Sequence, residues 1–178
     1  AAHGIRIKNC HVSNSAAILT DVKHFYSVRE GIMLYGMYPD SEPVENGPLK
    51  PVMTLKARVS QVRNLPKGAT VSYGRTYRAE EGITSAVIPA GYADGYPRRL
   101  SNMGKAFING KAYNQIGRIC MDVCMADVTG GDVRQGDEAI LFGRGGMSIE
   151  DVAQIVGTIN YELTCLVTER ANRVYVNN

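Results

Sequence analysis

Residues 52–62, VMTLKARVSQV, contain an alternation of apolar and polar side chains. The apolar side chains that share one face belong to Met53, Leu55, Ala57 and Val59. Because successive side chains of a β-strand point to opposite faces of its sheet, this alternation predicts a half-buried antiparallel strand. Antiparallel sheets of this kind keep one face in the core and the other in water, so the stretch predicts the fold of the region that follows it.

Six further stretches after residue 62 are also typical of short strands. They are TVSYG (70–74), ITSAVIPAG (83–91), GKAFI (104–108), KAYNQIG (111–117), CMDVCMADV (120–128) and DEAILFG (137–143). Between two of them, Asn109-Gly110 predicts a tight hairpin, because a type I′ turn needs positive φ at both central residues.

The stretch SIEDVAQIVG (148–157) predicts a helix near the end of the chain. Ser148 can cap it, Asp151 occupies the capping-box position, and Gly157 suits the left-handed conformation that ends a helix. We therefore expect a mainly β domain with short helices after residue 51.

The residues before this region follow another pattern. IRIKNCHV (5–12) and SVREGIMLYG (27–36) are typical of strands, and SNSAAILTDV (13–22) predicts a short helix capped by Ser13 or Asn14. This order is one repeat of a parallel α/β arrangement, too small to close a sheet alone. Tyr38–Pro51 holds four prolines and one glycine, which predicts a linker between the two regions.

Composition narrows the functional class. The 178 residues carry 20 basic and 17 acidic side chains without a basic run, which argues against nucleic acid as a partner and leaves a small anion possible. No apolar run of about 18 residues and no signal peptide is present, so we expect no membrane span and a cytoplasmic protein. The four cysteines lack zinc-type spacing and read as reduced thiols, with Cys10 and Cys165 favoured as small buried hydrophobes.

Two stretches of the first region suggest an anion site. In HVSNSAA (11–17), Asn14 and Ser15 stand at a helix start, where free N–H groups favour an anion. Taken alone, this stretch is better explained as a plain helix cap. Arg29 precedes Gly31, where the lack of a side chain would let backbone N–H groups approach a phosphate. Taken alone, Arg29 is better explained as a surface or structural ion-pair partner.

Other stretches pair reactive side chains with turns. In GRICMD (117–122), Arg118 and Asp122 flank an apolar run, and a buried Arg–Asp pair is one explanation for them. The tyrosines of VSYGRTY (71–77) and GYADGY (91–96) adjoin glycines, so a turn could expose their phenols. A phenol with a pKa of about 10 needs a neighbouring cation to act as a base. With one, it can exchange a proton with a carbon acid.

Six motifs in one order, HVSNSAA, VREGIMLYG, VSYGRTY, GYADGY, GRICMD and TINYE, resemble the bacterial alanine racemases. The resemblance implies a pyridoxal 5′-phosphate enzyme with an N-terminal (β/α)8 barrel and a mainly β C-terminal domain, assembled as a head-to-tail homodimer. Residues 1–40 would then be the last βαβ portion of the barrel, residues 41–51 the linker and residues 52–178 the C-terminal domain.

The resemblance also implies roles for single residues. Tyr73 matches the family's tyrosine acid/base, which acts on one face of the substrate α-carbon from the neighbouring subunit. Arg29 matches the arginine that faces the pyridine nitrogen of the cofactor, and His11 matches the residue hydrogen-bonded to that arginine. Because an arginine keeps its proton, it leaves that nitrogen largely unprotonated, which restrains the electron sink and fits racemisation.

The remaining matches surround the cofactor phosphate and the substrate. Ser15 and the backbone of Gly31 and Ile32 match the phosphate cradle, where Asn14 has a supporting role. Tyr161 matches a tyrosine that reaches the phosphate and helps to position the acid/base tyrosine; by itself it would be a core aromatic of a helix.

The substrate side of the site is matched by three residues. Met121, with Cys120 beside it, matches the segment whose backbone meets the substrate carboxylate. Tyr92 matches a tyrosine that narrows access to the site. No metal ligand is implied.

The chain also departs from the family. The family's Schiff-base lysine lies in a segment resembling V-x-K-A-N-A-Y-G-H-G, and none of the lysines stands in that context; they are Lys8, Lys23, Lys50, Lys56, Lys67, Lys105 and Lys111. The barrel arginine that contacts the substrate carboxylate is missing too. We therefore expect the C-terminal half of such an enzyme, inactive alone.

Three functions remain open on the sequence. The first is a two-base alanine racemase that supplies D-alanine for peptidoglycan precursors. The second is a non-catalytic dimerisation and substrate-gating module. The third is a serine racemase of the glycopeptide-resistance type, against which Tyr161 argues because a smaller residue there would leave space for a hydroxymethyl group.

Overall fold

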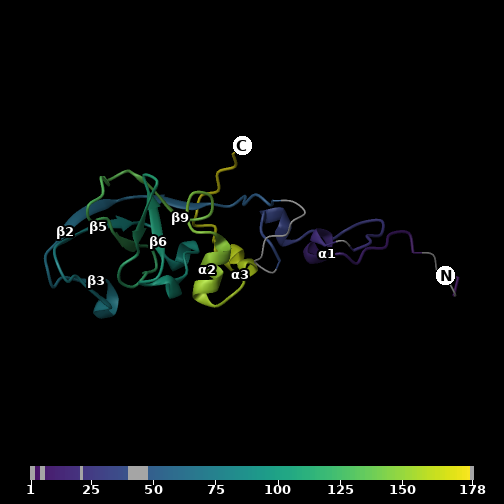
Figure 1. The fold of residues 1–178 in the computed structure, drawn as a ribbon, viewed down its shortest axis with the longest axis horizontal. Coiled ribbons are helices and arrows are strands. Elements are labelled where there is room, and N and C mark those ends of the chain that lie inside the picture. Colours follow the sequence, from purple (N-terminus) through teal and green to yellow (C-terminus); the bar gives the residue numbers. More distant parts are fainter. Residues whose placement is uncertain (1–2, 5–6, 21, 40–47, 177–178) are drawn as a thin grey trace. The chain divides into compact units, whose positions relative to one another are not determined.

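The computed structural model describes residues 3–4, 7–20, 22–39 and 48–176. The chain divides into two compact units, Ala1–Val52 and Met53–Asn178 (Figure 1). The larger unit is a mainly antiparallel β domain with a few short helices, as predicted. Within the described ranges, no helix has both the length and the apolar character needed to cross a membrane.

In the described part of the larger unit, the strands form three antiparallel sheets. The first has the strand order β1-β9-β6-β7, with β1 at Leu55–Arg58, β9 at Glu138–Phe142, β6 at Lys105–Ile108 and β7 at Lys111–Asn114. The second has the order β2-β5-β8, with β2 at Gln61–Leu65, β5 at Ile83–Ile88 and β8 at Cys124–Asp127. The third pairs β3 (Thr70–Val71) with β4 (Tyr77–Arg78).

The alternating stretch 52–62 forms two strands in two sheets rather than one strand. Its alternation is confirmed at β1, where Leu55 is buried while Lys56 and Arg58 are exposed. At the next residues the chain changes sheet: the Val59 N–H donates to the carbonyl of Asp137, directly before β9 of the first sheet, and the Ser60 N–H donates to that of Val87 in β5. Strands that switch sheets in this way form the corners of packed β structures.

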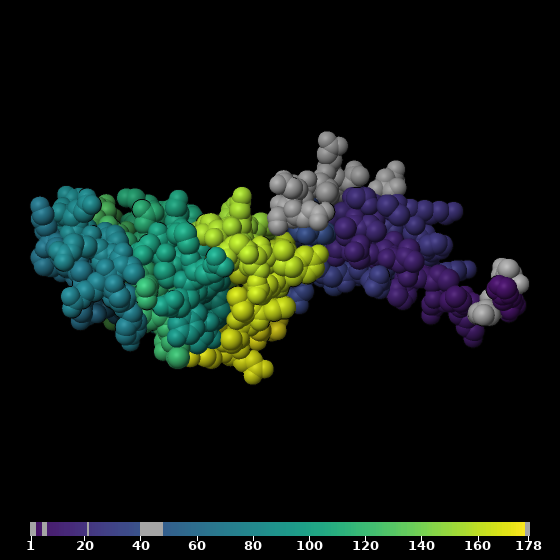
Figure 2. Space-filling view, turned by 90° about the horizontal axis from the view of Figure 1, so that it is seen from below, coloured from purple at the N-terminus to yellow at the C-terminus, as the bar shows by residue number. Residues whose placement is uncertain are grey.

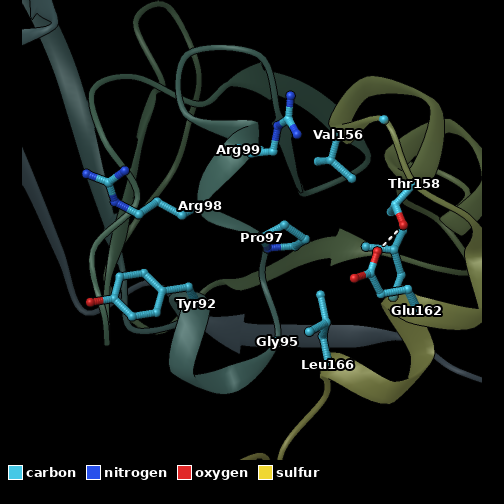
Figure 3. Close-up of a pocket in the computed structure, with 11 residues that line it drawn as sticks. Tyr92, Gly95, Pro97, Arg98, Arg99, Val156, Thr158, Glu162 and Leu166 are labelled. Carbon is cyan, nitrogen blue, oxygen red and sulfur yellow. Dashed lines mark hydrogen bonds between the residues drawn. The ribbon is translucent and has the colours of Figure 1, made fainter.

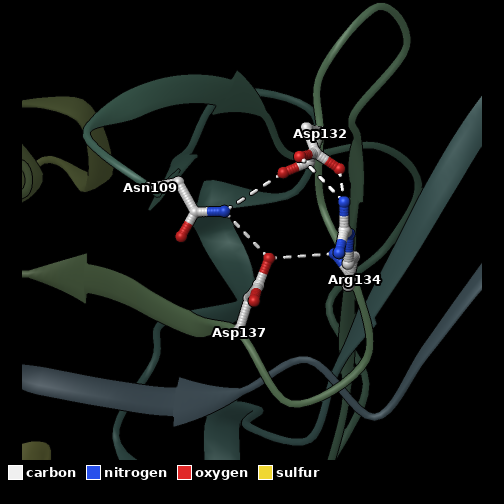
Figure 4. Close-up of polar contacts among 4 residues, drawn as sticks. All are labelled: Asn109, Asp132, Arg134 and Asp137. Carbon is white, nitrogen blue, oxygen red and sulfur yellow. Dashed lines mark hydrogen bonds and ion pairs between the residues drawn. The ribbon is translucent and has the colours of Figure 1, made fainter.

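The hairpin predicted at Asn109-Gly110 is present between β6 and β7, whose last pair is Ile108 with Lys111. Both turn residues have positive φ, 51° at Asn109 and 75° at Gly110. The Asn109 amide also donates to the carbonyl of Asp132 (3.1 Å) and to Oδ2 of Asp137 (2.9 Å), which joins the hairpin to the loop before β9 (Figure 4).

The helix predicted at 148–157 is α2, Ile149–Val156. The Ser148 hydroxyl accepts from the Asp151 N–H at 2.9 Å, and Gly157 ends the helix with φ 74°, as predicted. A second helix, α3, follows at Asn160–Leu166. Helix α2 packs against the short 3-10 helix η4 (Arg98–Leu100), and Figure 2 shows the yellow-green C-terminal residues adjoining the teal middle of the chain.

The smaller unit contains helix α1 (Ser15–Leu19) and the 3-10 helix η1 (Ile32–Tyr35). Asn14 is the cap of α1, and its side chain accepts from the Ala17 N–H at 3.1 Å. The two predicted strands are wrong for residues 7–12 and 27–36, where the structure has irregular backbone and η1. A strand needs a hydrogen-bonded neighbour, and the described part of this unit has no sheet to supply one.

The expected burial of two cysteines is wrong, and the expected domain boundaries stay predictions. The four cysteines are free thiols, but Cys165 is exposed and Cys10 half-buried, so neither is the small core residue that we expected; Cys124 is the buried one. Cys165 lies on an outward position of α3, while Leu163 faces the core. The boundaries 1–40, 41–51 and 52–178 stay predictions, and residues 41–47 of the linker lie outside the described residues.

Candidate functional site

Tyr73 lies on an exposed turn directly after β3. It begins the short 3-10 helix η2 (Tyr73–Arg75), and 74% of its surface is accessible to solvent. Its two neighbours have positive φ, 63° at Ser72 and 70° at Gly74. The phenol is therefore presented at the surface, as the glycine-flanked sequence suggested.

A cavity of about 510 Å³ opens beside this tyrosine. It is lined by Tyr73, Tyr92, Arg98, Arg118, Ile119, Cys120, Met121, Asp122 and Val123. Four of these residues, Tyr73, Tyr92, Cys120 and Met121, were selected from the sequence, and they come from three separate motifs. The fold thus brings together the acid/base candidate and the residues assigned to substrate binding.

The loop between β7 and β8 forms one wall of the cavity and is anchored at its start. The buried side chain of Gln115 donates to the carbonyls of Ile116 (3.0 Å) and Gly117 (2.8 Å). The Gly117 N–H donates to the side chain of Asn102 at 2.6 Å, and the Ile119 N–H donates to Ser101 at 3.0 Å. These contacts hold the loop without regular secondary structure.

The segment that carries Tyr92 is bonded to the same loop. The Tyr92 N–H donates to the carbonyl of Cys120 and the Ala93 N–H to that of Met121, each at 3.0 Å. The Met121 N–H makes no hydrogen bond with any residue that the structure describes. Because Met121 lines the cavity, this N–H is a candidate donor to a ligand there.

Two arginines make the cavity electropositive. Among the described residues, no carboxylate forms an ion pair with Arg98 or Arg118. The cavity's one acid, Asp122, is paired instead with Arg170, which also contacts Asp94 at 3.2 Å. The Arg118–Asp122 pair considered from the sequence is therefore wrong: Asp122 takes its partner from the end of the chain. Two uncompensated guanidinium groups favour an anionic ligand such as a carboxylate.

A second cavity, of about 360 Å³, lies where η4 faces α2 and α3. Tyr92 and Arg98 line both cavities, and Figure 3 shows their side chains extending in one direction, away from Glu162 and Leu166. Glu162 accepts a hydrogen bond from the Thr158 hydroxyl. The residues shared by the two cavities therefore form the partition between them.

Tyr161 lies on α3 and does not line the cavity beside Tyr73. Its side chain is 38% exposed, so it is not the core aromatic that an isolated helix residue would be. Within this chain the structure leaves it at the surface, and its role toward a cofactor phosphate stays a prediction.

The candidate phosphate residues of the smaller unit lie together. The buried Ser15 hydroxyl accepts from the Gly31 N–H at 2.9 Å, although sixteen residues separate them. Ile32, next in the chain, is buried. Asn14 is occupied as the cap of α1. The structure thus brings two distant stretches of the chain into contact, and their role toward an anion stays a prediction.

Arg29 and His11 are both exposed in this unit. The Arg29 guanidinium donates to the carbonyl of Val12 at 3.3 Å, and the main-chain N–H of Arg29 donates to the carbonyl of Ser13 at 2.7 Å. The hydrogen bond between His11 and Arg29 that the resemblance implies stays a prediction.

Sequence reasoning did not select Arg98 or Ile119. Arg98 is one of two adjacent arginines in PRRL (97–100), and nothing in that stretch distinguishes the one that reaches the cavity. No group of His, Cys, Asp or Glu side chains suited to a metal ion occurs in the described part of the chain.

Residues 52–175 match the family "Alanine racemase, C-terminal domain", and residues 1–39 match "Alanine racemase, N-terminal domain". The chain is 49% identical to the alanine racemase of Carboxydothermus hydrogenoformans over 98% of its own length and 49% of the relative. It is 44% identical to the alanine racemase of Clostridium novyi, over 98% of its own length and 47% of that relative. The chain thus spans about half the length of the curated relatives it matches.

Solved structures are similar over the same span. Alanine racemase of Clostridium difficile 630, in complex with cycloserine, matches with a TM-score of 0.92 and 41% identity, over 99% of this chain and 48% of that one. Alanine racemase of Bartonella henselae, with covalently bound pyridoxal phosphate, matches with a TM-score of 0.84 and 34% identity, over 96% of this chain and 48% of that one.

Proposed function

This chain belongs to the alanine racemase family, and we propose that it provides the tyrosine acid/base of an enzyme that interconverts L- and D-alanine. The observation that carries the proposal is the exposed Tyr73 phenol on the wall of a cavity with two unpaired arginines. The product would supply peptidoglycan precursors in the cytoplasm.

In this proposal Tyr73 exchanges a proton with one face of the substrate α-carbon. The Met121 N–H meets the substrate carboxylate, and the positive charge of Arg98 and Arg118 draws that carboxylate toward the cavity. Tyr92 narrows the opening. A second base is needed on the opposite face, a role that the family gives to a lysine with no match among these residues.

The residues of the smaller unit fit the phosphate of pyridoxal 5′-phosphate. A Cβ added to Gly31 would lie 3.3 Å from the Ser15 hydroxyl oxygen, so the absence of a side chain lets that hydroxyl and the Gly31 N–H approach each other closely. Ser15, Gly31 and Ile32 would hold the phosphate, and Arg29 would face the pyridine nitrogen. When bound, the cofactor supplies an electron sink for charge that develops at the α-carbon.

A head-to-tail homodimer is part of the same proposal. Tyr73 and Arg29 are both exposed, which suits two groups that meet across a subunit boundary. Light scattering on the full-length protein would test this, and a fully active monomer would contradict it.

Tyr73→Phe in a full-length racemase that contains these 178 residues tests the main proposal. Removing a general acid/base costs about two to four decades in rate, so racemisation of alanine should fall by that amount while cofactor absorbance is retained. Tyr77→Phe is a matched control, since Tyr77 belongs to the same motif but does not line the cavity. Turnover of Tyr73→Phe close to wild type would refute the acid/base role.

The alternative of a non-catalytic module applies to these 178 residues taken alone, in which no lysine stands in a context like that of the family's Schiff-base lysine. Mixing the 178-residue chain with pyridoxal 5′-phosphate separates the two, because a Schiff-base absorption band would contradict the module. Serine against alanine as substrate must be decided by kinetics, since one hydroxyl group discriminates weakly in an open pocket.

A further inference from the structure

Ser72 stands directly before the proposed acid/base, and we propose that it is a positioning residue that sets the direction of the Tyr73 phenol. The inference rests on the proposed role of Tyr73. Ser72 does not line the cavity of about 510 Å³, but it borders a neighbouring hollow of about 380 Å³ together with Tyr73 and Cys120. We infer that Ser72 acts on catalysis through the direction of its neighbour rather than by contact with the substrate.

The backbone of Ser72 has an unusual conformation. Its φ is 63° and its ψ is −176°. This region is essentially restricted to glycine, because a Cβ crowds the adjoining peptide groups. A serine persists there when its surroundings hold it in place, and such residues cluster at functional sites.

Hydrogen bonds of the Ser72 hydroxyl stabilise this conformation. It donates to the carbonyl of Arg118 at 2.6 Å, and its oxygen lies 3.3 Å from the Cys120 thiol, which can donate to it. Both partners belong to the loop that forms the cavity wall and lie more than forty residues further along the chain. One short side chain thus ties the turn of Tyr73 to the segment that carries Met121.

The other side of Tyr73 rests on the same loop. A Cβ added to Gly74 would lie 3.1 Å from Cζ of Arg118 and 3.4 Å from its Nε, so the guanidinium group covers this glycine. At Gly117, where φ is 73°, an added Cβ would lie 2.7 Å from the carbonyl oxygen of Val71. Contacts on both sides therefore relate the Tyr73 backbone to the cavity wall.

These contacts predict an order among Ser72 variants. Ser72→Ala keeps the Cβ that disfavours this conformation but loses the hydroxyl that holds it, so the turn should relax and move the phenol. Ser72→Gly also loses the hydroxyl, yet glycine adopts this conformation freely. Activity should therefore decrease in the order serine, glycine, alanine, although glycine is the greater truncation.

The test measures racemisation by full-length enzyme containing these residues. For Ser72→Ala, kcat should fall about ten- to hundred-fold, as expected for a misplaced catalytic group, with a much smaller change in KM. Ser72→Gly should lose less. Ser60→Ala is the matched control, because the Ser60 hydroxyl also donates to a main-chain carbonyl, that of Val87 at 3.1 Å, outside the cavity. A wild-type kcat in Ser72→Ala, or a higher kcat in Ser72→Ala than in Ser72→Gly, would overturn the inference.

A double variant separates positioning from an independent effect. If Ser72 acts through the phenol, adding Ser72→Ala to Tyr73→Phe should cause no further loss of kcat. A multiplied loss would overturn the inference. Should Ser72→Ala fail to fold, the same cycle with Ser72→Gly replaces it.

Failure of the proposed acid/base role can be distinguished from failure of the positioning role of Ser72. If Tyr73→Phe keeps full activity, the acid/base role fails, but the positioning of the ring is still measurable in the 178-residue chain. NMR resonances of the Tyr73 ring should shift in Ser72→Ala and not in Ser60→Ala. Unchanged ring resonances would overturn the inference on their own.

Discussion

The main-chain N–H of Tyr92 donates to the carbonyl of Cys120 at 3.0 Å, which joins two motifs that lie far apart in the sequence. The contact is possible because Gly91 precedes Tyr92: a Cβ on Gly91 would lie 2.2 Å from that same carbonyl oxygen. The residue expected to narrow the site and the loop expected to bind substrate are therefore joined at one glycine.

Gly91→Ala should destabilise the larger unit. The added methyl would clash with main-chain oxygens of Cys120 and Met121, which cannot move as a flexible side chain can. Overpacking of this kind costs about 1–3 kcal/mol. Urea unfolding measures the loss, with Gly82→Ala as control because its Cβ would find an ordinary 3.9 Å contact. Equal stability of the two variants would contradict the close approach.

Arg98→Gln should weaken substrate binding in the full-length enzyme by removing one of the two unpaired charges of the cavity. We expect KM to rise about three- to tenfold with a smaller change in kcat, and the difference from wild type to shrink at high salt. Arg63→Gln on the exposed face of β2 is the control. An unchanged KM at low salt would show that Arg98 does not attract the carboxylate.

Asp137→Asn should reduce the acid sensitivity of folding. The Arg134 N–H and the Asn109 amide donate to its carboxylate and hold the pKa of Asp137 below its usual value (Figure 4). A lowered folded-state pKa contributes stability above the unfolded pKa of about 3.9, and that stability is lost as pH falls through the lower value. Unfolding measured between about pH 2 and 5 should therefore depend less on pH in the variant. The same dependence in both proteins would argue against these hydrogen bonds.

Tyr96→Phe should preserve or raise stability. The Tyr96 hydroxyl is fully buried and has no hydrogen-bond partner among the described residues, and burial raises the pKa of its phenol. An unsatisfied buried polar group costs about 1–3 kcal/mol, so removing it costs little and can be favourable. Thermal unfolding is the measurement, and a loss greater than about 1 kcal/mol would mean that the hydroxyl has a partner such as bound water.

Patterns with a local cause were predictable from the sequence. The Asn109-Gly110 turn and the ends of α2 depend on backbone preferences of a few adjacent residues, so they were predicted with their caps. The strands expected at residues 5–12 and 27–36 were wrong in the described residues, because pairing with a distant segment, rather than local preference, makes a strand.

The sequence alone determined the mainly β fold, its turns and helix caps, and the order of motifs that carries the family resemblance. It also selected Tyr73, Tyr92, Cys120 and Met121. Only the tertiary structure placed these four around one cavity, added Arg98 to its wall and paired Asp122 with Arg170. The physical reason is that periodicity and caps act between near neighbours in the chain, whereas a cavity and its charge are set by contacts between distant residues.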